Sequence, residues 1–133
     1  MKKYLLDTNI CIYFFKGQFG LHEKIATIGE ENCLLSEITI AELKYGAENS
    51  FQKEKNRKNV AEFIAKFEVL PIFPALDIFA KEKARLKTKG RILDDFDLLI
   101  GTTAIHNRLT LVTRNISDFD RLDGIEMEDW TAL

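Results

Sequence analysis

Four acidic residues of this 133-residue chain stand at junctions between apolar segments, where they could act together. They are Asp7, Glu42, Asp97 and Asp118. Carboxylates that are grouped without histidine or cysteine suit hard cations such as Mg²⁺ or Mn²⁺. Two such ions about 3.5–4 Å apart can activate a water molecule and stabilise the leaving oxygen when a phosphodiester is cleaved. The pattern therefore favours metal-assisted hydrolysis of a phosphate ester.

Two of these acids also have a purely structural explanation. Asp7, or Thr8 or Asn9 after it, is a suitable N-cap for a following helix. The stretch from Thr39 to Glu42 matches a capping box, in which the Glu42 side chain reaches back to the Thr39 amide. Each residue taken alone is therefore a weak sign of catalysis.

The other two acids have structural alternatives of the same kind. Asp97 in a first helical turn is favoured by the helix dipole, with Asp94 and Asp95 as the more obvious caps. Asp118 or Ser117 suits the start of a short turn. The combination of four is more informative, because acids at one edge of a sheet repel one another unless cations lie among them.

Five short apolar segments predict the strands. They cover residues 4–6, 33–36, 69–73, 109–113 and 125–127. The first is continuously apolar, as is typical of a strand covered on both faces in a parallel sheet. Pro71 places the third at an edge or makes it irregular. Helical patterns lie between these segments, so the predicted class is α/β with a mainly parallel sheet of four to five short strands and right-handed crossovers.

Apolar residues at helical spacing predict the helices. They cover residues 10–16, 21–28, 39–45, 60–67, 74–90 and 96–104. We expect Gly46 to end or kink the third helix, and the polar stretch 48–58 to be a solvated helix face or a loop. The apolar face of the fifth helix is expected to comprise Leu76, Phe79, Ala80 and Ala84.

The predicted sheet brings most of the acids to one place. Ligands of open α/β sheets bind at the carboxyl ends of the strands. Asp7, Glu42 and Asp118 each follow a predicted strand, so that rule gathers them at one edge. Asp97 precedes its strand, and the rule does not place it.

Composition indicates a globular protein of one domain, residues 1–133. The chain is 46% hydrophobic and 30% charged with a net charge of −2, so it lacks the overall positive charge that is typical of nucleic-acid-binding proteins. Cys11 and Cys33 are too few for a disulfide scaffold and are expected to be buried free thiols. Neither a membrane span nor a signal peptide is visible, so we expect a cytoplasmic protein.

Other side chains offer weaker possibilities. His22 and His106 lie in helical segments and are expected to be structural, and nothing resembles a zinc site or a glycine-rich phosphate loop. The basic run of residues 81–91 is usually a solvated surface, although some of its side chains share one helix face. Arg114, close to Asp118 in sequence, is the better candidate for contact with a substrate phosphate.

Several motifs together resemble the PIN-domain toxins of the VapC type, over nearly the whole chain. The matching segments are 5–9, 36–43 with Tyr45-Gly46, 97–100, 111–115 with Asp118-Phe119, and the ending Glu128-Asp129-Trp130. Each motif is short, but four in this order and spacing are specific.

The resemblance implies a three-layer α/β/α domain with a Mg²⁺-dependent ribonuclease site. Asp7, Glu42 and Asp97 match the three acids of the family, and Asp118 matches a fourth, more variable acid. The residues expected around them are Thr8, Asn9, Thr113, Arg114 and Asn115. Gly101-Thr102 replaces the Ala-Ala common in the family, which changes close helix packing rather than the acids.

The resemblance also implies partners. These are a small antitoxin protein, an RNA substrate and a second copy of the chain, with transfer RNA favoured because proteins read exposed loops in RNA. We expect Phe14, Phe15 and Phe51 to be incompletely covered by the core, which supports a homodimer that also binds an antitoxin.

Two other classes of function remain open at this stage. A receiver-type signalling domain would also hold Mg²⁺ among acids, but it needs an acceptor aspartate after the third strand, and residues 69–75 contain none. A phosphatase with an aspartate nucleophile would want an acid at position 9, where Asn9 stands. A non-catalytic binding module would tolerate loss of the acids.

Overall fold

The computed structural model describes residues 2–132 and is built around a five-stranded, wholly parallel sheet. The strands are β1 (Tyr4–Leu6), β2 (Cys33–Ser36), β3 (Glu68–Leu70), β4 (Thr110–Val112) and β5 (Glu126–Glu128). Their order is β3-β2-β1-β4-β5, so the first strand of the chain lies at the centre. The predicted α/β class and parallel sheet are confirmed, and β3, which Pro71 follows, lies at an edge as expected.

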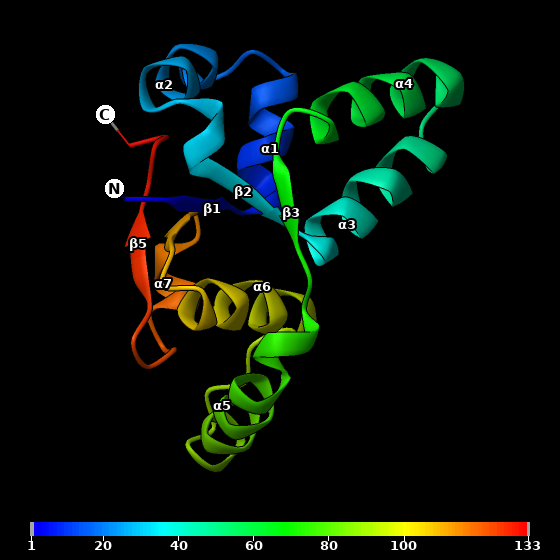
Figure 1. Ribbon diagram of the computed structural model, residues 1–133. Coiled ribbons are helices and arrows are strands. Elements are labelled where there is room, and N and C mark those ends of the chain that lie inside the picture. Colours follow the sequence, from blue (N-terminus) through cyan, green and yellow to red (C-terminus); the bar gives the residue numbers. More distant parts are fainter. Residues whose placement is uncertain (1, 133) are drawn as a thin grey trace.

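Seven α-helices cover the two faces of the sheet within the described residues (Figure 1). They are α1 (Thr8–Phe15), α2 (Leu21–Ile28), α3 (Glu37–Glu48), α4 (Lys53–Ile64), α5 (Leu76–Thr88), α6 (Asp95–His106) and α7 (Ile116–Phe119), with short 3₁₀ turns at Glu30–Asn32 and Phe73–Ala75. Helices α1 to α4 pack mainly on one face, and α5 to α7 lie on the other. The result is the expected three-layer α/β/α arrangement.

Alternation along the strands divides the core in two. Leu6, Leu35 and Val112 belong to the cluster beneath α1 to α4. Leu5 and Leu111 belong to the cluster beneath α6 and α7. Successive side chains of a strand point to opposite faces, so strands of three or four apolar residues supply both layers at once. This explains why the central strand β1 contains no polar alternation, whereas the edge strand β5 has Glu126 and Glu128 on either side of Met127.

The start of α3 differs from the prediction. Ser36, the last residue of β2, is the N-cap, and its Oγ accepts the Ile38 amide at 3.1 Å. Thr39 lies inside the helix, and the helix runs through Gly46 to Glu48. The chain turns directly from strand to helix, so the earlier of two suitable caps is the one used.

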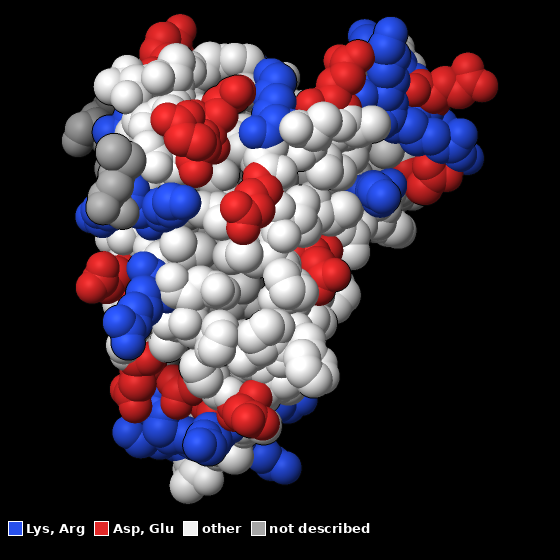
Figure 2. All heavy atoms as spheres, in the orientation of Figure 1, with Lys and Arg blue, Asp and Glu red and all other residues white. Residues whose placement is uncertain are grey.

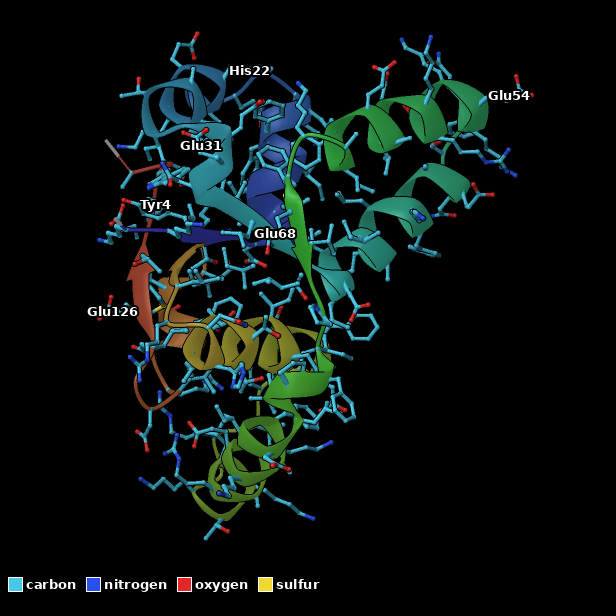
Figure 3. All side chains as sticks on the ribbon, in the orientation of Figure 1. Tyr4, His22, Glu31, Glu54, Glu68 and Glu126 are labelled. Carbon is cyan, nitrogen blue, oxygen red and sulfur yellow. The ribbon has the colours of Figure 1, made fainter. Side chains whose placement is uncertain are left out.

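The polar stretch 48–58 is partly turn and partly helix. It covers the turn after α3 and the first half of α4, and Arg57 pairs with Glu48 across the hairpin. Helices α3 and α4 project from the body as an arm (Figure 1). Glu54, at the far end of the arm, points into solvent (Figure 3). Figure 2 shows basic and acidic side chains intermixed on this arm.

Exposure of the phenylalanines corrects one expectation. Phe15 and Phe51 are exposed as predicted, and Phe51 at the α3–α4 turn is completely so. Phe14 is only 7% exposed, because its ring packs against Phe63 and stacks on His22. The prediction that the core leaves Phe14 incompletely covered is therefore wrong.

Helix α5 buries a different face from the one predicted. Its buried residues are Glu82 and Leu86, whereas Ala80 and Ala84 are exposed. In Figure 1, α5 lies beyond α6, on the side away from the sheet. A helix in this outer position has only a narrow strip covered, so apolar residues off that strip stay in solvent.

Gly101 and the cysteines fit the sequence. A Cβ at Gly101 would collide with the Leu122 side chain and press on Phe119, so glycine lets α6 approach α7 closely. Cys11 and Cys33 are buried free thiols. No helix of residues 2–132 has the length and apolar character needed to cross a membrane.

Candidate active site

An open cleft of about 700 Å³ lies at the carboxyl edge of the sheet. The first turns of α1 and α6 and the middle of α3 form its walls. Its lining residues are Asp7, Thr8, Asn9, Ile12, Ala41, Glu42, Tyr45, Phe96, Asp97 and Asn115. Three of the four predicted acids therefore meet in one cleft.

Asp7 is the most buried of these acids, at 3% exposed. It caps α1, and its Oδ1 accepts the Thr8 amide at 2.8 Å. Its Oδ2 accepts the Thr113 hydroxyl at 2.9 Å, and Thr113 Oγ1 accepts the Asn115 amide at 3.0 Å. Burial raises the pKa of the Asp7 carboxyl, even though the hydrogen bonds from Thr113 and Thr8 act to lower it. Asp7 is thus both the helix cap and a cleft residue.

Glu42 faces α1 rather than its own helix start. Its Oε1 accepts the Thr8 hydroxyl at 2.6 Å, and Thr8 Oγ1 lies 3.0 Å from Thr39 Oγ1. Thr39 is fully buried within α3. The capping box between Thr39 and Glu42 is therefore wrong, and Thr39 instead supports the threonine that holds Glu42.

Asp97 reaches the cleft because of the direction of α6. Only residues 107–109 separate the end of α6 from the start of β4, so the helix runs back across the sheet and begins at the carboxyl edge. Asp94 is the N-cap, and its side chain accepts the Phe96 amide. Burial raises the pKa of Asp97 to about 6, and the charges of Asp7, Asp94, Glu42 and Asp118 add to this rise.

Asp118 stands apart from the other three acids. It lies in α7, is exposed, and sits 3.7 Å from Arg121 Nη2. It is absent from the lining of the cleft, although its charge still contributes to the raised pKa of Asp97. Its role as a fourth acid stays a prediction.

Of the residues predicted to surround the acids, four line or touch the cleft and one lies outside it. Thr8, Asn9 and Asn115 line the cleft, and Thr113 touches it through Asp7. Arg114 does not line it. The Arg114 guanidinium lies over the rings of Tyr13 and Phe19, 5.6 and 5.2 Å from their centroids. The structure thus leaves Arg114 outside the cleft, packed on aromatic rings.

The PIN domain family model matches residues 4–125. This chain belongs to the PIN-domain family. The relatives of this PIN domain include Ribonuclease VapC2 of Rickettsia felis, 34% identical over 130 residues, which cover 96% of this chain and 97% of the relative. The tRNA(fMet)-specific endonuclease VapC of Shigella flexneri is 33% identical over 132 residues, covering 98% of this chain and all of the relative.

A solved structure agrees with this placement. The DNA-bound VapBC complex of Salmonella typhimurium contains a chain that is 35% identical, with a TM-score of 0.90. The match covers 98% of this PIN domain and 99% of that chain. The expected resemblance to the VapC type, and the fold that it implies, are therefore confirmed.

The cleft of the PIN domain suits a hard cation in charge and donor type. Its three carboxylates come from separate elements, and the pKa of Asp97 is raised first by burial and then by the neighbouring acids, with no cation lowering it. Within residues 2–132, no three acidic, histidine or cysteine side chains converge closely enough to hold one ion as they stand. Mg²⁺ commonly binds through one or two carboxylates and several waters, a mode that these residues fit.

Sequence reasoning missed the apolar flank of the cleft. Tyr45 and Phe96 line it and are exposed. Tyr45 lies three residues after Glu42 on α3, and Phe96 immediately precedes Asp97. The i, i+3 spacing, which places two side chains on one helix face, was the available signal for Tyr45.

Proposed function

We propose that this PIN domain is a Mg²⁺-dependent endoribonuclease and the toxin of a toxin–antitoxin pair. The observation that carries the proposal is the meeting of Asp7, Glu42 and Asp97, from three elements, in one cleft. Bringing three carboxylates together costs electrostatic energy at neutral pH, and a bound cation recovers it. Mn²⁺ has the same ligand preference and is the alternative ion.

The relatives support a transfer RNA as the substrate. Proteins of Shigella flexneri and Salmonella typhimurium that are 33% and 35% identical to this chain are named tRNA(fMet)-specific endonucleases. We infer that initiator transfer RNA is the substrate here, and that cleavage takes place in the cytoplasm, where transfer RNA is used.

The chain itself positions the reacting groups. The Thr8 amide holds one oxygen of Asp7 and the Thr113 hydroxyl holds the other, which fixes the orientation of the carboxylate. The Thr8 hydroxyl also fixes Glu42 across the cleft. Asp97, with a pKa of about 6, is mostly ionised at neutral pH and holds a proton only in more acidic solution.

Asp7, Glu42 and Asp97 are the residues that would hold the ion. Bound there, Mg²⁺ would supply an acidified water and charge to offset that of the phosphate. The Asp7 carboxylate stays in place through its threonine contacts while the phosphate is held.

The proposed protein partners are an antitoxin and a second copy of the chain. The Salmonella neighbour is a VapBC complex, and another neighbour is a toxin-antitoxin complex from Klebsiella pneumoniae. A groove of about 430 Å³ between α1, α3 and α4 includes the exposed ring of Phe15, as an apolar contact surface requires. Co-purification with the product of a neighbouring gene, and light scattering of the isolated chain, test the two partners separately.

The deciding experiment is cleavage of purified RNA. Initiator transfer RNA is incubated with the full chain in Mg²⁺, with an elongator transfer RNA and a chelated sample beside it, and the new RNA ends are sequenced. We expect one cut in the initiator species that requires Mg²⁺ and is absent with the Asp7→Asn variant. Cleavage that is equal in the chelated sample, or equal with Asp7→Asn, would contradict the proposal.

A further inference from the structure

Two aromatic residues that line the cleft with the acids are exposed to solvent. Tyr45 comes from α3 and is 68% exposed, and Phe96 comes from α6 and is 47% exposed. Both line the cleft that contains Asp7, Glu42 and Asp97. Neither ring packs against another aromatic ring of residues 2–132, unlike Phe14, whose ring contacts Phe63.

The cleft has no basic side chains in its lining, within residues 2–132. Among the described residues that line the cleft, none is lysine or arginine. Two basic residues adjoin lining residues in the sequence: Lys44 lies outside the lining, and Arg114 is engaged with Tyr13 and Phe19. Nucleic-acid sites usually draw their affinity from lysine and arginine contacts to phosphates. A substrate in this cleft must obtain affinity from another kind of contact.

Aromatic faces provide such a contact. Bases stack on exposed aromatic rings without regard to sequence, because every base has a π-face. Bases within a duplex are stacked on their neighbours, and only unpaired nucleotides present free faces. Any nucleotide whose phosphate reaches the acids brings its neighbouring bases beside Tyr45 and Phe96, since these rings share the lining with the acids.

We propose that Tyr45 and Phe96 stack on the unpaired bases that flank the cleaved phosphate, and so restrict the PIN domain to single-stranded segments of RNA. This inference rests on the proposed ribonuclease function. It adds the means by which the substrate is recognised and the residues responsible. The rings position the phosphate over Asp7 and Asp97 without taking part in the chemistry.

Binding without cleavage is measured in the Asp7→Asn protein. The probe is initiator transfer RNA with 2-aminopurine at one loop position at a time, because the fluorescence of that base is quenched when it stacks. We expect quenching at positions next to the cleaved bond. Adding Tyr45→Ala or Phe96→Ala should weaken binding roughly 5- to 150-fold, the range found when a stacking ring is truncated. Each alanine substitution should also abolish the fluorescence quench at the one position whose base stacks on the ring that was removed.

The matched control is Phe51→Ala, which removes a fully exposed ring at the α3–α4 turn, outside the cleft. We expect its binding to stay within twofold of the parent protein. Tyr45→Phe and Phe96→Tyr keep a stacking face and should restore binding that the alanine variants lose. In the active protein, Tyr45→Ala should raise KM far more than it lowers kcat, because the acids are untouched.

The possible outcomes distinguish failure of the stacking role from failure of the proposed ribonuclease function. Wild-type cleavage together with unchanged KM in both alanine variants overturns the stacking role. Unchanged RNA binding with weakened binding of a co-purified antitoxin also overturns it, since the rings would then be protein contacts. If the wild-type chain cleaves no RNA but the quench persists and depends on Tyr45, stacking stands and the ribonuclease proposal falls.

Discussion

Two carboxylates, Asp7 and Glu82, are buried to nearly the same extent and have opposite surroundings. Asp7 is 3% exposed and Glu82 is 7% exposed. Glu82, on α5, accepts hydrogen bonds from Arg85 Nε at 2.7 Å, Arg85 Nη2 at 2.9 Å and the Asp123 amide at 2.8 Å. Hydrogen bonding to Arg85 lowers the pKa of the Glu82 carboxyl. Its charge is satisfied within the protein.

Asp7 receives only neutral donors, and its nearest charged neighbours are acids. Its pKa is raised, chiefly by burial, with a contribution from Glu42. A carboxylate with an arginine partner ties elements together, whereas one without a cation remains available to an ion from solution. The comparison therefore distinguishes an acid that has a cationic partner from one that has none, and it leads to four predictions.

The largest expected effect is on cleavage by Asp7→Asn. Asparagine preserves the shape and one acceptor oxygen but loses the charge that holds a cation. We expect the rate to fall by more than the roughly 10- to 100-fold that loss of a hydrogen-bonding partner around a metal costs. Cleavage of initiator transfer RNA at saturating Mg²⁺ measures it, and Glu82→Gln is the control that should retain activity. Equal losses in both variants would erase the distinction between the two acids.

Stability should be lowered more by Glu82→Gln than by Asp7→Asn, the reverse of their expected effects on cleavage. Glu82→Gln removes the charged partner of Arg85 and weakens three hydrogen bonds in a buried place, so we expect the free energy of unfolding to fall by about 1–3 kcal/mol. Asp7→Asn should cost less, because it also relieves repulsion. Urea unfolding of both variants in chelator measures the difference. A Glu82→Gln protein as stable as wild type would show that the ion pair of α5 contributes nothing.

The dependence of stability on pH should distinguish Asp97 from Glu82. The folded pKa of Asp97 is about 6, above its ordinary value of 3.8, so the folded state binds more protons than the unfolded state between these values. In chelator, the unfavourable contribution of Asp97 is absent below pH 3.8 and is fully present above about 6. Asp97→Asn should therefore gain stability relative to wild type as pH rises through that window.

The contribution of Glu82 to stability changes with pH in the opposite direction to that of Asp97. Its folded pKa is lowered, so its stabilising contribution is present above the unfolded pKa of 4.5 and is lost as pH falls through the folded value. Thermal unfolding at a series of pH values, for wild type and the Asp97→Asn and Glu82→Gln variants, tests both signs. An Asp97→Asn protein that is equally destabilised at every pH would identify Asp97 as a helix-end residue only.

The smallest expected effect is stabilisation by Mg²⁺. A ligand that binds only the folded state raises stability by RT ln(1 + [L]/Kd), about 0.4 kcal/mol when its concentration equals Kd. Millimolar Mg²⁺ should raise the Tm of wild type more than that of Asp97→Asn, and should leave the response of Glu82→Gln like that of wild type. Equal shifts in all three proteins would place the ion elsewhere.

The sequence was sufficient for the sheet but not for every helix. Continuous apolar runs at residues 4–6 and 33–36 leave little alternative to buried parallel strands. The start of α3 was missed because Ser36 and Thr39 are both good caps, and only the end of β2 decides between them. The buried face of α5 was missed because it depends on α6, which comes later in the chain.

The site was predictable where residue type determines the role. Asp7 and Glu42 follow strands, and the strand-end rule gathers them. Asp97 needed the family resemblance, although a helix that precedes a parallel strand must begin at the carboxyl edge, as α6 does. The exposure of Tyr45 and Phe96 was not predictable, because nothing in a residue type says which surface its neighbours leave uncovered.

The central place of β1 has a consequence for the newly made chain. This strand is synthesised first but lies between β2 and β4, and the Thr113 that holds Asp7 follows it by 106 residues. Chains leave the ribosome from their N-terminus, so Asp7 emerges long before β4 and the Thr113 that holds it. A nascent chain therefore lacks a finished cleft until β4 and Thr113 have emerged, and the ribosome that makes this PIN domain meets an assembled site only after that point.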